Sequence, residues 1–358
     1  MKSGTLSFPG VRDAVSRIIA LLARSSEEPS VTDISLLSNG EVAIRENTFL
    51  QCSKQPWLAE DWAGGMVALL GIPPWMEKPR RLAALIKVIE IGKRRFRCVW
   101  SCHRRGEELA IRPLPNSILS PEALGLPDVL TDTVTALSGG LILICGPTGA
   151  GKSWSMASLM RHRAERRGGK YITLESPIEF LHDNTERAIF HQREIGEDVA
   201  TYALGLEEAL IQNPDFIGVQ ELRDKASAET ALAAALSGHL VMATLHAHDA
   251  ASAAERYATL MEATLDQKSS SMQTLSLALE LIVAMRLLPG HGGLVPVFDI
   301  ITLRESPTAA KRIPKLMSMI ANGQANALRN EQVTGRQSGM ITFEQCILKR
   351  MTEGVLLV

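Results

Sequence analysis

Short apolar runs alternate with longer amphipathic segments along the second two-thirds of the chain. The apolar runs have the length and composition of buried strands, and the segments between them have helical spacing. Strands are predicted over 141–145, 171–174, 216–219 and 240–245, and helices over 152–167, 202–212 and 224–237. Such alternation is typical of a buried, largely parallel sheet. The last hundred residues are predicted to be mainly helical, with one strand over 295–302.

The first part of the chain mixes strand and helix patterns. Apolar runs over 34–37 and 42–44 flank Ser38-Asn39-Gly40, and Asn-Gly between two such runs predicts a hairpin. A helix is predicted over 79–91 from apolar residues at helical spacing. Two more strands, 96–100 and 109–111, are predicted around the polar turn 103–106.

A proline-rich segment separates these two patterns. Pro113, Pro115, Pro121 and Pro127 lie within fifteen residues, a density that is typical of a semi-rigid linker. We therefore expect two domains, residues 1–115 and residues 116–358. Hydrophobic residues make up 46% of the 358 residues and charged residues 22%, which excludes wholesale disorder.

Charge and aromatic content limit the possible partners. Thirty-eight Lys and Arg balance 39 Asp and Glu, so the net charge of −1 does not indicate a protein that coats a polyanion. Aromatic residues are only 4% of the chain, which disfavours a platform for stacking single-stranded bases.

Cysteines and apolar stretches indicate the compartment. The five cysteines form no Cys-x-x-Cys pair, so no zinc site is expected, and reduced thiols in a cytosol fit their irregular spacing. The first ten residues lack the apolar region of a signal peptide, and the stretch 274–288 is too short to span a membrane. We expect a cytoplasmic protein that reaches a membrane through partners.

One segment matches the phosphate-binding loop pattern G-x-x-x-x-G-K-[ST] at every fixed position: Gly146-Pro147-Thr148-Gly149-Ala150-Gly151-Lys152-Ser153. Glycines let backbone N–H groups turn toward phosphate oxygens. Lys152 would reach the β- and γ-phosphates, and the Ser153 hydroxyl would bind Mg²⁺. A predicted strand ends at Cys145 and a helix begins after Gly151, so a helix N-terminus would face the anion. The sequence therefore predicts a nucleotide-binding loop.

Three more segments place polar residues at the ends of apolar strands. Glu175 and Glu179 follow the second strand, in the segment Ile172-Thr173-Leu174-Glu175-Ser176-Pro177-Ile178-Glu179-Phe180. Glu221 ends the strand in 214–224, and His246 ends the strand in 238–246.

These segments resemble the Asp box, Walker B segment and His box of the secretion (traffic) ATPases, the motors of type IV pili and of type II and type IV secretion. The resemblance runs over about residues 30–345 and includes Thr32-Asp33-Ile34-Ser35 and Arg286-Leu287-Leu288-Pro289. The chain length and the missing cysteine pairs argue against the pilus-assembly and type II branch, which carries a tetracysteine zinc element. Residues 175–180 are most similar to the Dot/Icm-type and IncI-plasmid conjugation ATPases, relatives of the pilus-retraction motor PilT.

The resemblance implies an α/β protein, with a PAS-like N-terminal domain followed by a RecA-like P-loop ATPase domain and a helical C-terminal region. It implies a homohexamer that binds ATP and Mg²⁺ between the two domains and moves one domain against the next subunit on hydrolysis. The implied role is to power a type IVB-like secretion or conjugative transfer apparatus at the inner membrane, with components of that machine as partners. Type IV pilus retraction is the alternative.

Several positions depart from the family pattern. Ser176 stands where Asp is usual, Gln220 where Gly is usual, and Ile211 where Arg is common. The helix A-I-R-N-L-I-R of the retraction motor is replaced by residues 309–315, in which Pro314 is expected to break the helix. These departures argue against pilus retraction as such and leave the ATPase core unaffected.

Within this resemblance, four residues have expected catalytic roles. Glu221 is expected to polarise the attacking water, because it closes an apolar strand beside the expected γ-phosphate; a structural ion pair with Arg223 is the alternative. Glu175 and Glu179 are expected to act through metal-bound water or to position the nucleophile, unless one of them only caps the loop after its strand. His246 is expected to sense the γ-phosphate, although a lone histidine at a strand end is more often structural.

Residues 78–112 carry eleven Lys or Arg against three acids, a local charge of +8. A solvated basic face is the simplest interpretation, and contact with nucleic acid is a second, although only Phe96 and Trp100 could stack there. The third is that arginines reach the ATP of a neighbouring subunit, as in the family. Arg97 and Arg112 align with the family arginines in R-x-R-V-N and L-R-x-I-P and are candidate catalytic residues.

Two other classes of function stay open. One is a P-loop nucleic-acid translocase or helicase, which the balanced charge and scarce aromatics disfavour; no direct sequence-specific binding of nucleic acid is expected. The other is an ATP-binding regulatory subunit without turnover, with which Gln220 and Ser176 are consistent.

Overall fold

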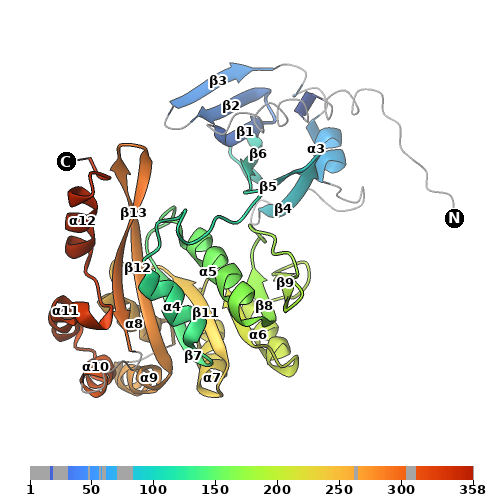
Figure 1. Cartoon of the computed structure of the whole chain (residues 1–358). Helices are drawn as coiled ribbons and strands as arrows, with labels where there is room; N and C mark the ends of the chain where they lie inside the picture. The colour runs from blue at the N-terminus through green and yellow to red at the C-terminus, as the bar shows by residue number, and fades with distance from the viewer. Residues whose placement is uncertain are drawn as a thin grey trace. The chain divides into compact units, whose positions relative to one another are not determined.

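The chain divides into two compact units, Met1–Ser117 and Ile118–Val358, each with a hydrophobic core of its own. A computed structural model of the protein describes residues 17–18, 31–46, 49–55, 58, 62–70, 84–261, 265–303 and 312–357. Figure 1 labels the helices and strands of both units.

The first unit is a six-stranded antiparallel sheet with a helix packed against it. The strand order is β3-β2-β1-β6-β5-β4. Its elements are β1 (Val31–Leu37), β2 (Glu41–Glu46), β3 (Phe49–Lys54), α3 (Trp62–Leu70), β4 (Leu85–Ile91), β5 (Arg94–His103) and β6 (Gly106–Pro113).

Two of the three local predictions for this unit are confirmed. The hairpin at Asn39-Gly40 joins β1 to β2, with Gly40 at a φ of 86°, and β5 pairs with β6 around the predicted turn. The predicted helix over 79–91 is wrong over 85–91, which form β4 and pair along their whole length with β5. The β-branched residues of this run favour the extended backbone over the helix. Residues 79–83 lie outside the described residues.

The second unit is a seven-stranded sheet of order β13-β12-β7-β11-β10-β8-β9, in which only the β12–β13 pair is antiparallel. Its elements are α4 (Asp128–Ala136), β7 (Gly140–Cys145), α5 (Lys152–Arg167), β8 (Gly169–Glu175), β9 (Ala188–Glu194), α6 (Tyr202–Ile211), β10 (Phe216–Val219), α7 (Lys225–Leu236), β11 (Leu240–Leu245), α8 (Ala250–Met261), α9 (Leu265–Ala278), β12 (Leu279–Gly290), β13 (Gly293–Thr302), α10 (Ile313–Ala321), α11 (Ala325–Thr334), the 3₁₀ helix η1 (Gly335–Ser338) and α12 (Phe343–Thr352).

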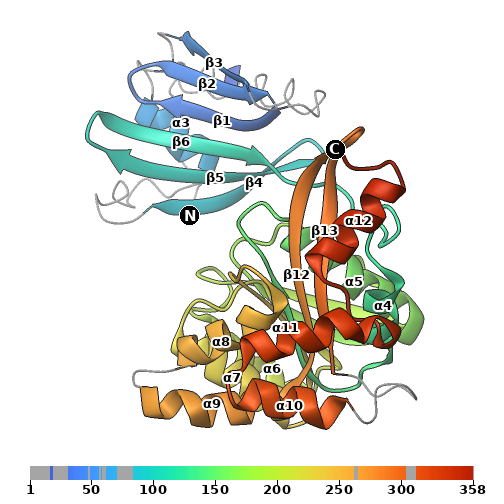
Figure 2. The ribbon, with the colours of Figure 1, turned by 90° about the vertical axis from the view of Figure 1, so that its left-hand side faces the viewer.

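Helices cover both faces of this sheet. Thr173 and Gly218 lie against Met156 and Met160 of α5, whereas Leu174 lies against Gly205 of α6. Successive residues of a strand point to opposite faces, so α5 and α6 cover opposite sides. Figure 2 shows α10, α11 and α12 beside the β12–β13 hairpin, and α12 packs on β13.

The predicted fold class is confirmed: an α/β chain with a PAS-like sheet unit, a RecA-like unit and a helical C-terminal region. Strands β9 and β12 and helix α4 were not predicted. Pro314 does not break a helix, because it lies in the first turn of α10, where the missing N–H would have no partner in the helix. Residues 309–311 lie outside the described residues.

The five cysteines are all free thiols. Among the described residues, no three His, Cys, Asp or Glu side chains are placed to hold a metal ion. No helix in these described ranges is long and apolar enough to cross a bilayer.

Candidate active site

The loop between β7 and α5 has a backbone that favours glycine at three of its positions, Gly146, Gly149 and Gly151, all of which have positive φ. Gly151 has a φ of 94°, in the left-handed region, directly before the first residue of α5. A Cβ on Gly146 would lie 2.4 Å from the carbonyl oxygen of Met285 on β12. Pro147, Thr148 and Gly149 are exposed, so the middle of the loop faces solvent. Ala150 is buried and packs into the core, which holds the loop in place.

The side chains at the start of α5 suit an anionic ligand. The Lys152 ammonium donates to the carbonyl oxygens of Gly146 (2.8 Å) and Pro147 (3.1 Å). Burial lowers the pKa of Lys152, and the nearby Glu221 carboxylate opposes that shift. The Ser153 hydroxyl has no hydrogen-bond partner among the described residues. An ammonium and a hydroxyl in this position are the groups that phosphate oxygens and Mg²⁺ need.

Parallel pairing brings the other candidate residues of this unit to the same edge of the sheet. Cys145 at the end of β7 pairs with Leu245 at the end of β11. Val219 at the end of β10 pairs with both Leu174 and Ala243. The residues that follow these strands, among them Glu221 and His246, therefore emerge on the side of the loop.

Glu221 and His246 contact each other directly. One carboxylate oxygen of Glu221 lies 3.0 Å from Nε2 of His246. The other accepts from Nε of Arg223 at 2.8 Å and lies 2.7 Å from its terminal nitrogen. The structure therefore contains both the ion pair with Arg223 and a contact with the predicted sensor residue.

Glu175 is more buried than Glu221, and its strand lies farther from β7 in the sheet. Its strand β8 is separated from β7 by β11 and β10. Its side chain accepts from the Thr173 hydroxyl (2.6 Å) and from Nε2 of Gln192 (2.9 Å). Burial raises the pKa of Glu175 to about 6, with a further contribution from the Glu179 carboxylate. Glu175 and Glu179 thus influence each other electrostatically, and Glu175 forms no direct contact with the Glu221–His246 pair.

Gln220 joins the ends of β8 and β10. Its side chain accepts from the backbone N–H of Ser176 and donates to the carbonyl oxygen of Pro177 (3.1 Å). Its own carbonyl accepts from the Thr244 hydroxyl at the end of β11. Two of the residues that depart from the family pattern, Ser176 and Gln220, are thus hydrogen-bonded to each other.

Three more residues of this region were not predicted from the sequence. Gln192 bridges Glu175 and the carbonyl oxygen of Phe180 (2.7 Å). The Tyr202 hydroxyl is buried and has no hydrogen-bond partner in the described part of the chain, and the charges of Arg223, Glu221 and Glu175 act on it. Arg256 of α8 lines a cavity of about 360 Å³ beside the loop, together with Gly146, Pro147, His246, Ala247, His248 and Ser252. In the sequence, the one sign that Arg256 could lie near the loop is its place on the helix that follows the His246 segment.

Arg97 and Arg112 lie in the first unit and are neighbours. They are paired directly across β5 and β6. Arg112 also donates from Nε (2.8 Å) and from a terminal nitrogen (2.6 Å) to one oxygen of Asp33, the acid of the Thr32-Asp33-Ile34-Ser35 segment. Part of the basic segment, residues 78–83, lies outside the described residues.

Residues 84–295 match the family described as Type II/IV secretion system protein. This span is more than half of the 358 residues. The chain belongs to this secretion family. The family membership predicted from the motifs is thereby confirmed.

Several relatives of this secretion-family protein are known. It is 36% identical over 254 residues to the uncharacterized protein YggR of Escherichia coli, which covers 71% of this chain and 74% of YggR. It is 30% identical over 269 residues to the type IV pilus retraction ATPase PilT of Pseudomonas aeruginosa, with 74% of each chain covered.

Two solved structures are similar over nearly the whole chain. A crystal structure of the pilus retraction motor PilT with bound ADP has a TM-score of 0.77 and 28% identity, and the match covers 95% of this chain and 94% of PilT. The ATPase DotB of Legionella pneumophila has a TM-score of 0.73 over 99% of both chains, and at 21% identity that likeness shows a shared fold.

The buried carboxyl group of Glu175 leads to a prediction about stability. Its pKa in the folded protein, about 6, is above its ordinary value of 4.5, so folding disfavours the ionised form. Wild-type stability should therefore fall as the pH rises from about 4.5 through 6. Glu175→Gln removes this loss and should stabilise the protein by up to about 2 kcal/mol at pH 8, with no gain at pH 4. Urea unfolding at both pH values measures the difference.

The matched control is Glu165→Gln on the exposed face of α5, which should change stability by the same small amount at both pH values. An equal effect of Glu175→Gln at pH 4 and pH 8 would contradict the raised pKa.

Proposed function

We propose that this secretion-family protein is an ATP hydrolase that works as a homohexamer. It powers a type IVB-like secretion or conjugative transfer apparatus from the cytoplasmic side of the inner membrane, together with membrane components of that machine. The observation that supports hydrolysis best is that Lys152, Glu221 and His246 gather at one edge of the sheet, with Glu221 3.0 Å from His246. The relatives named as ATPases support the same reaction.

ATP binding is assigned to the loop Gly146-Pro147-Thr148-Gly149-Ala150-Gly151-Lys152-Ser153. Lys152 exchanges its two carbonyl partners for β- and γ-phosphate oxygens, which are stronger acceptors because they are charged. The Ser153 hydroxyl holds Mg²⁺, which neutralises phosphate charge when bound. The N-terminus of α5 adds its own attraction for the anion.

Glu221 is assigned the role of orienting the attacking water. A carboxylate held from both sides by Arg223 and His246 has little rotational freedom, so its oxygens keep one position. His246 is 47% exposed, so it can turn toward the γ-phosphate without a large loss of packing while Arg223 still holds Glu221. His246 then senses whether the γ-phosphate is present, because it can bond to either Glu221 or the phosphate.

Glu175 and Glu179 are assigned roles in proton transfer and in positioning water at the site. With a pKa of about 6, Glu175 is a mixture of protonated and ionised forms near neutral pH and can move a proton to or from nearby water. Glu179, which is less buried than Glu175, is assigned the role of positioning the nucleophile or of acting through metal-bound water.

Arg97 and Arg112 are assigned to the ATP site of the neighbouring subunit in the hexamer. Their pairing across β5 and β6 places two guanidinium groups on one face of the first unit. The ion pair with Asp33 is exposed and therefore weak, so Arg112 can leave it for a phosphate at little cost.

Pilus retraction is the second candidate function. The 28% identity and TM-score of 0.77 with the retraction motor PilT favour it. The similarity of residues 175–180 to the Dot/Icm-type and IncI-plasmid conjugation ATPases favours secretion or conjugation. The two functions differ in phenotype, since a Lys152→Ala strain loses transfer of DNA or protein in the first case and pilus-driven surface motility in the second.

Lys152→Ala should abolish ATP turnover and leave the fold intact, because the ammonium bonds only to carbonyl oxygens of its own loop. A phosphate-release assay on the purified protein measures turnover, and thermal unfolding without nucleotide measures stability. Arg161→Ala, on the exposed face of the same helix, is the control and should retain turnover. Normal hydrolysis by Lys152→Ala would rule out the loop as the ATP site.

Glu221→Gln should bind ATP normally and hydrolyse it at least a hundredfold more slowly, the usual size of a general-base effect. The amide keeps the shape of the side chain but loses the negative charge that orients water. Binding is measured with a fluorescent ATP analogue, and turnover by phosphate release. If turnover stays within about twofold of the wild-type rate, the base is another residue, and Glu175 is next to be tested.

Mixed hexamers test the arginines. Arg97→Ala and Lys152→Ala hexamers should each be inactive, because an arginine on the γ-phosphate contributes about 10³–10⁵ in rate. Mixing the two chains creates sites with an intact loop and an intact neighbouring arginine, so mixing should restore activity. The same experiment applies to Arg112→Ala, and Arg104→Ala, in the turn between β5 and β6, is the control that should remain active alone. No recovery in hexamers proven to be mixed would mean that the arginine does not act on a neighbouring subunit.

A further inference from the structure

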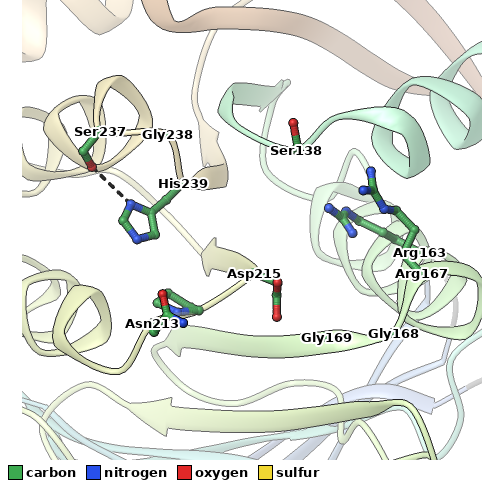
Figure 3. A pocket seen from close by; sticks show the side chains of 11 residues that line it. Ser138, Arg163, Arg167, Gly168, Gly169, Asn213, Asp215, Ser237, Gly238 and His239 are labelled. Atoms are coloured by element: carbon green, nitrogen blue, oxygen red, sulfur yellow. Dashed lines mark hydrogen bonds between the residues drawn. The ribbon is translucent and has the colours of Figure 1, made fainter.

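A second pocket lies at the opposite edge of the sheet from the loop 146–153. It has a volume of about 490 Å³, in the range of small-molecule sites. Its walls are the turns that precede β7, β8, β10 and β11, together with the last turns of α5 (Figure 3). These are the amino ends of the parallel strands, whereas Glu221 and His246 follow the carboxyl ends. The pocket is thus separate from the candidate active site.

Arg163 is a buried cation in the wall of this pocket. Its side chain is only 3% exposed, and burial lowers the pKa of its guanidinium group. One terminal nitrogen donates to the carbonyl oxygen of Leu137 (2.9 Å) and the other contacts the Tyr171 hydroxyl at 3.4 Å. Its Nε is buried and has no hydrogen-bond partner among the described residues. The Phe216 ring, with its centroid 5.7 Å from Cζ, and the nearby Asp215 carboxylate compensate the buried charge only in part.

Arg167 lies one helical turn further along α5 and is exposed. One of its terminal nitrogens donates to the carbonyl oxygens of Thr135, Ala136 and Leu137, at 3.1–3.2 Å. These contacts cap the end of α4 and use only part of the guanidinium group. Neither Arg163 nor Arg167 forms an ion pair within the described part of the chain. Figure 3 shows both guanidinium groups on the same side of the pocket.

The other walls carry groups of different chemistry. One oxygen of Asp215 accepts from the backbone N–H of Lys170 (2.7 Å), and among the described residues the other oxygen has no hydrogen-bond partner. His239 shares a hydrogen bond with the Ser237 hydroxyl (3.1 Å) and lies across the pocket from the arginines in Figure 3. Asn213 adds an exposed amide in a left-handed turn. The pocket therefore offers two cations at one end and hydrogen-bond acceptors elsewhere.

We propose that this pocket binds a phosphate-bearing small molecule, with Arg163 and Arg167 on the phosphate and Asp215 accepting from a hydroxyl or amino group of the same ligand. Two guanidinium groups from one helix face match the several oxygens of a phosphate. The Asp215 carboxylate, whose charge also acts on Arg163, would weaken the attraction for a bare anion, and a ligand that carries a donor group as well would offset this. A nucleoside monophosphate has both groups and fits the volume.

The test is equilibrium dialysis of the full chain with radiolabelled AMP in a Lys152→Ala background, where the loop 146–153 lacks its lysine. AMP should bind one site per chain, and inorganic phosphate should compete more weakly. Arg167→Ala and Arg163→Met should each weaken AMP binding at least tenfold, as expected for the loss of charged hydrogen bonds. Asp215→Asn should reduce the preference for AMP over phosphate. Circular dichroism checks the fold of each variant, and Arg167→Ala, at an exposed position, keeps the test valid if Arg163→Met does not fold.

The matched control is Arg166→Ala, whose side chain contacts His162 and does not line the pocket. It should leave AMP affinity within twofold. If phosphate competes as well as AMP, the ligand is free phosphate and the role of Asp215 is wrong. Absence of AMP and phosphate binding at millimolar concentration, or binding that neither arginine variant weakens, would overturn the proposal, as would acetate competing as well as phosphate.

Discussion

Parallel pairing among β7, β11, β10 and β8 is the constraint on which the chemistry of the second unit depends. Helices cover both faces of these strands, so their register is set by close contacts on each face. On one face Gly218 leaves room for Met156 and Met160 of α5, and on the other Leu174 packs against Gly205 of α6. The register therefore has little freedom, and the polar residues that follow the strands must emerge together. One edge collects the loop before α5, Glu221 and His246, and the other collects the turns around Arg163 and Asp215.

Two carboxylates at the first edge have opposite environments. Glu221 is partly exposed and paired with two cationic or potentially cationic side chains, whereas Glu175 is buried among neutral hydrogen-bond donors and has a raised pKa. Pairs of acids with such different surroundings divide the tasks of accepting and holding protons. Gln220 contributes by bonding to the backbone around Ser176, which fixes the loop after Glu175 relative to the strand that carries Glu221.

Most of the second unit could be predicted because its local and long-range signals agree. Helix α5 and strands β10 and β11 lie where the pattern predicted them, and β7 lies within a residue of its prediction. The helix predicted over 79–91 is wrong over 85–91 because apolar residues at 85, 86 and 89 suit both a helix and a strand. Only the pairing with β5 decides between the two. Helix α9 ends at Ala278 and strand β12 begins at the next residue, within one apolar stretch. No change in hydrophobicity therefore marks the start of the strand. The contacts of Gln192 and Arg163 depend on groups from distant segments, which no local pattern contains.

Helix α5 has 16 residues and is therefore about 24 Å long. Its first residue is Lys152 and its last turns carry Arg163 and Arg167, so one rigid rod ends at both edges of the sheet. Thermodynamic linkage makes the consequence symmetrical: a ligand at one end that shifts the helix changes affinity at the other end by the same factor in both directions. The ligand proposed for the far edge and the nucleotide proposed for the loop would therefore be coupled through this helix, without any contact between the two.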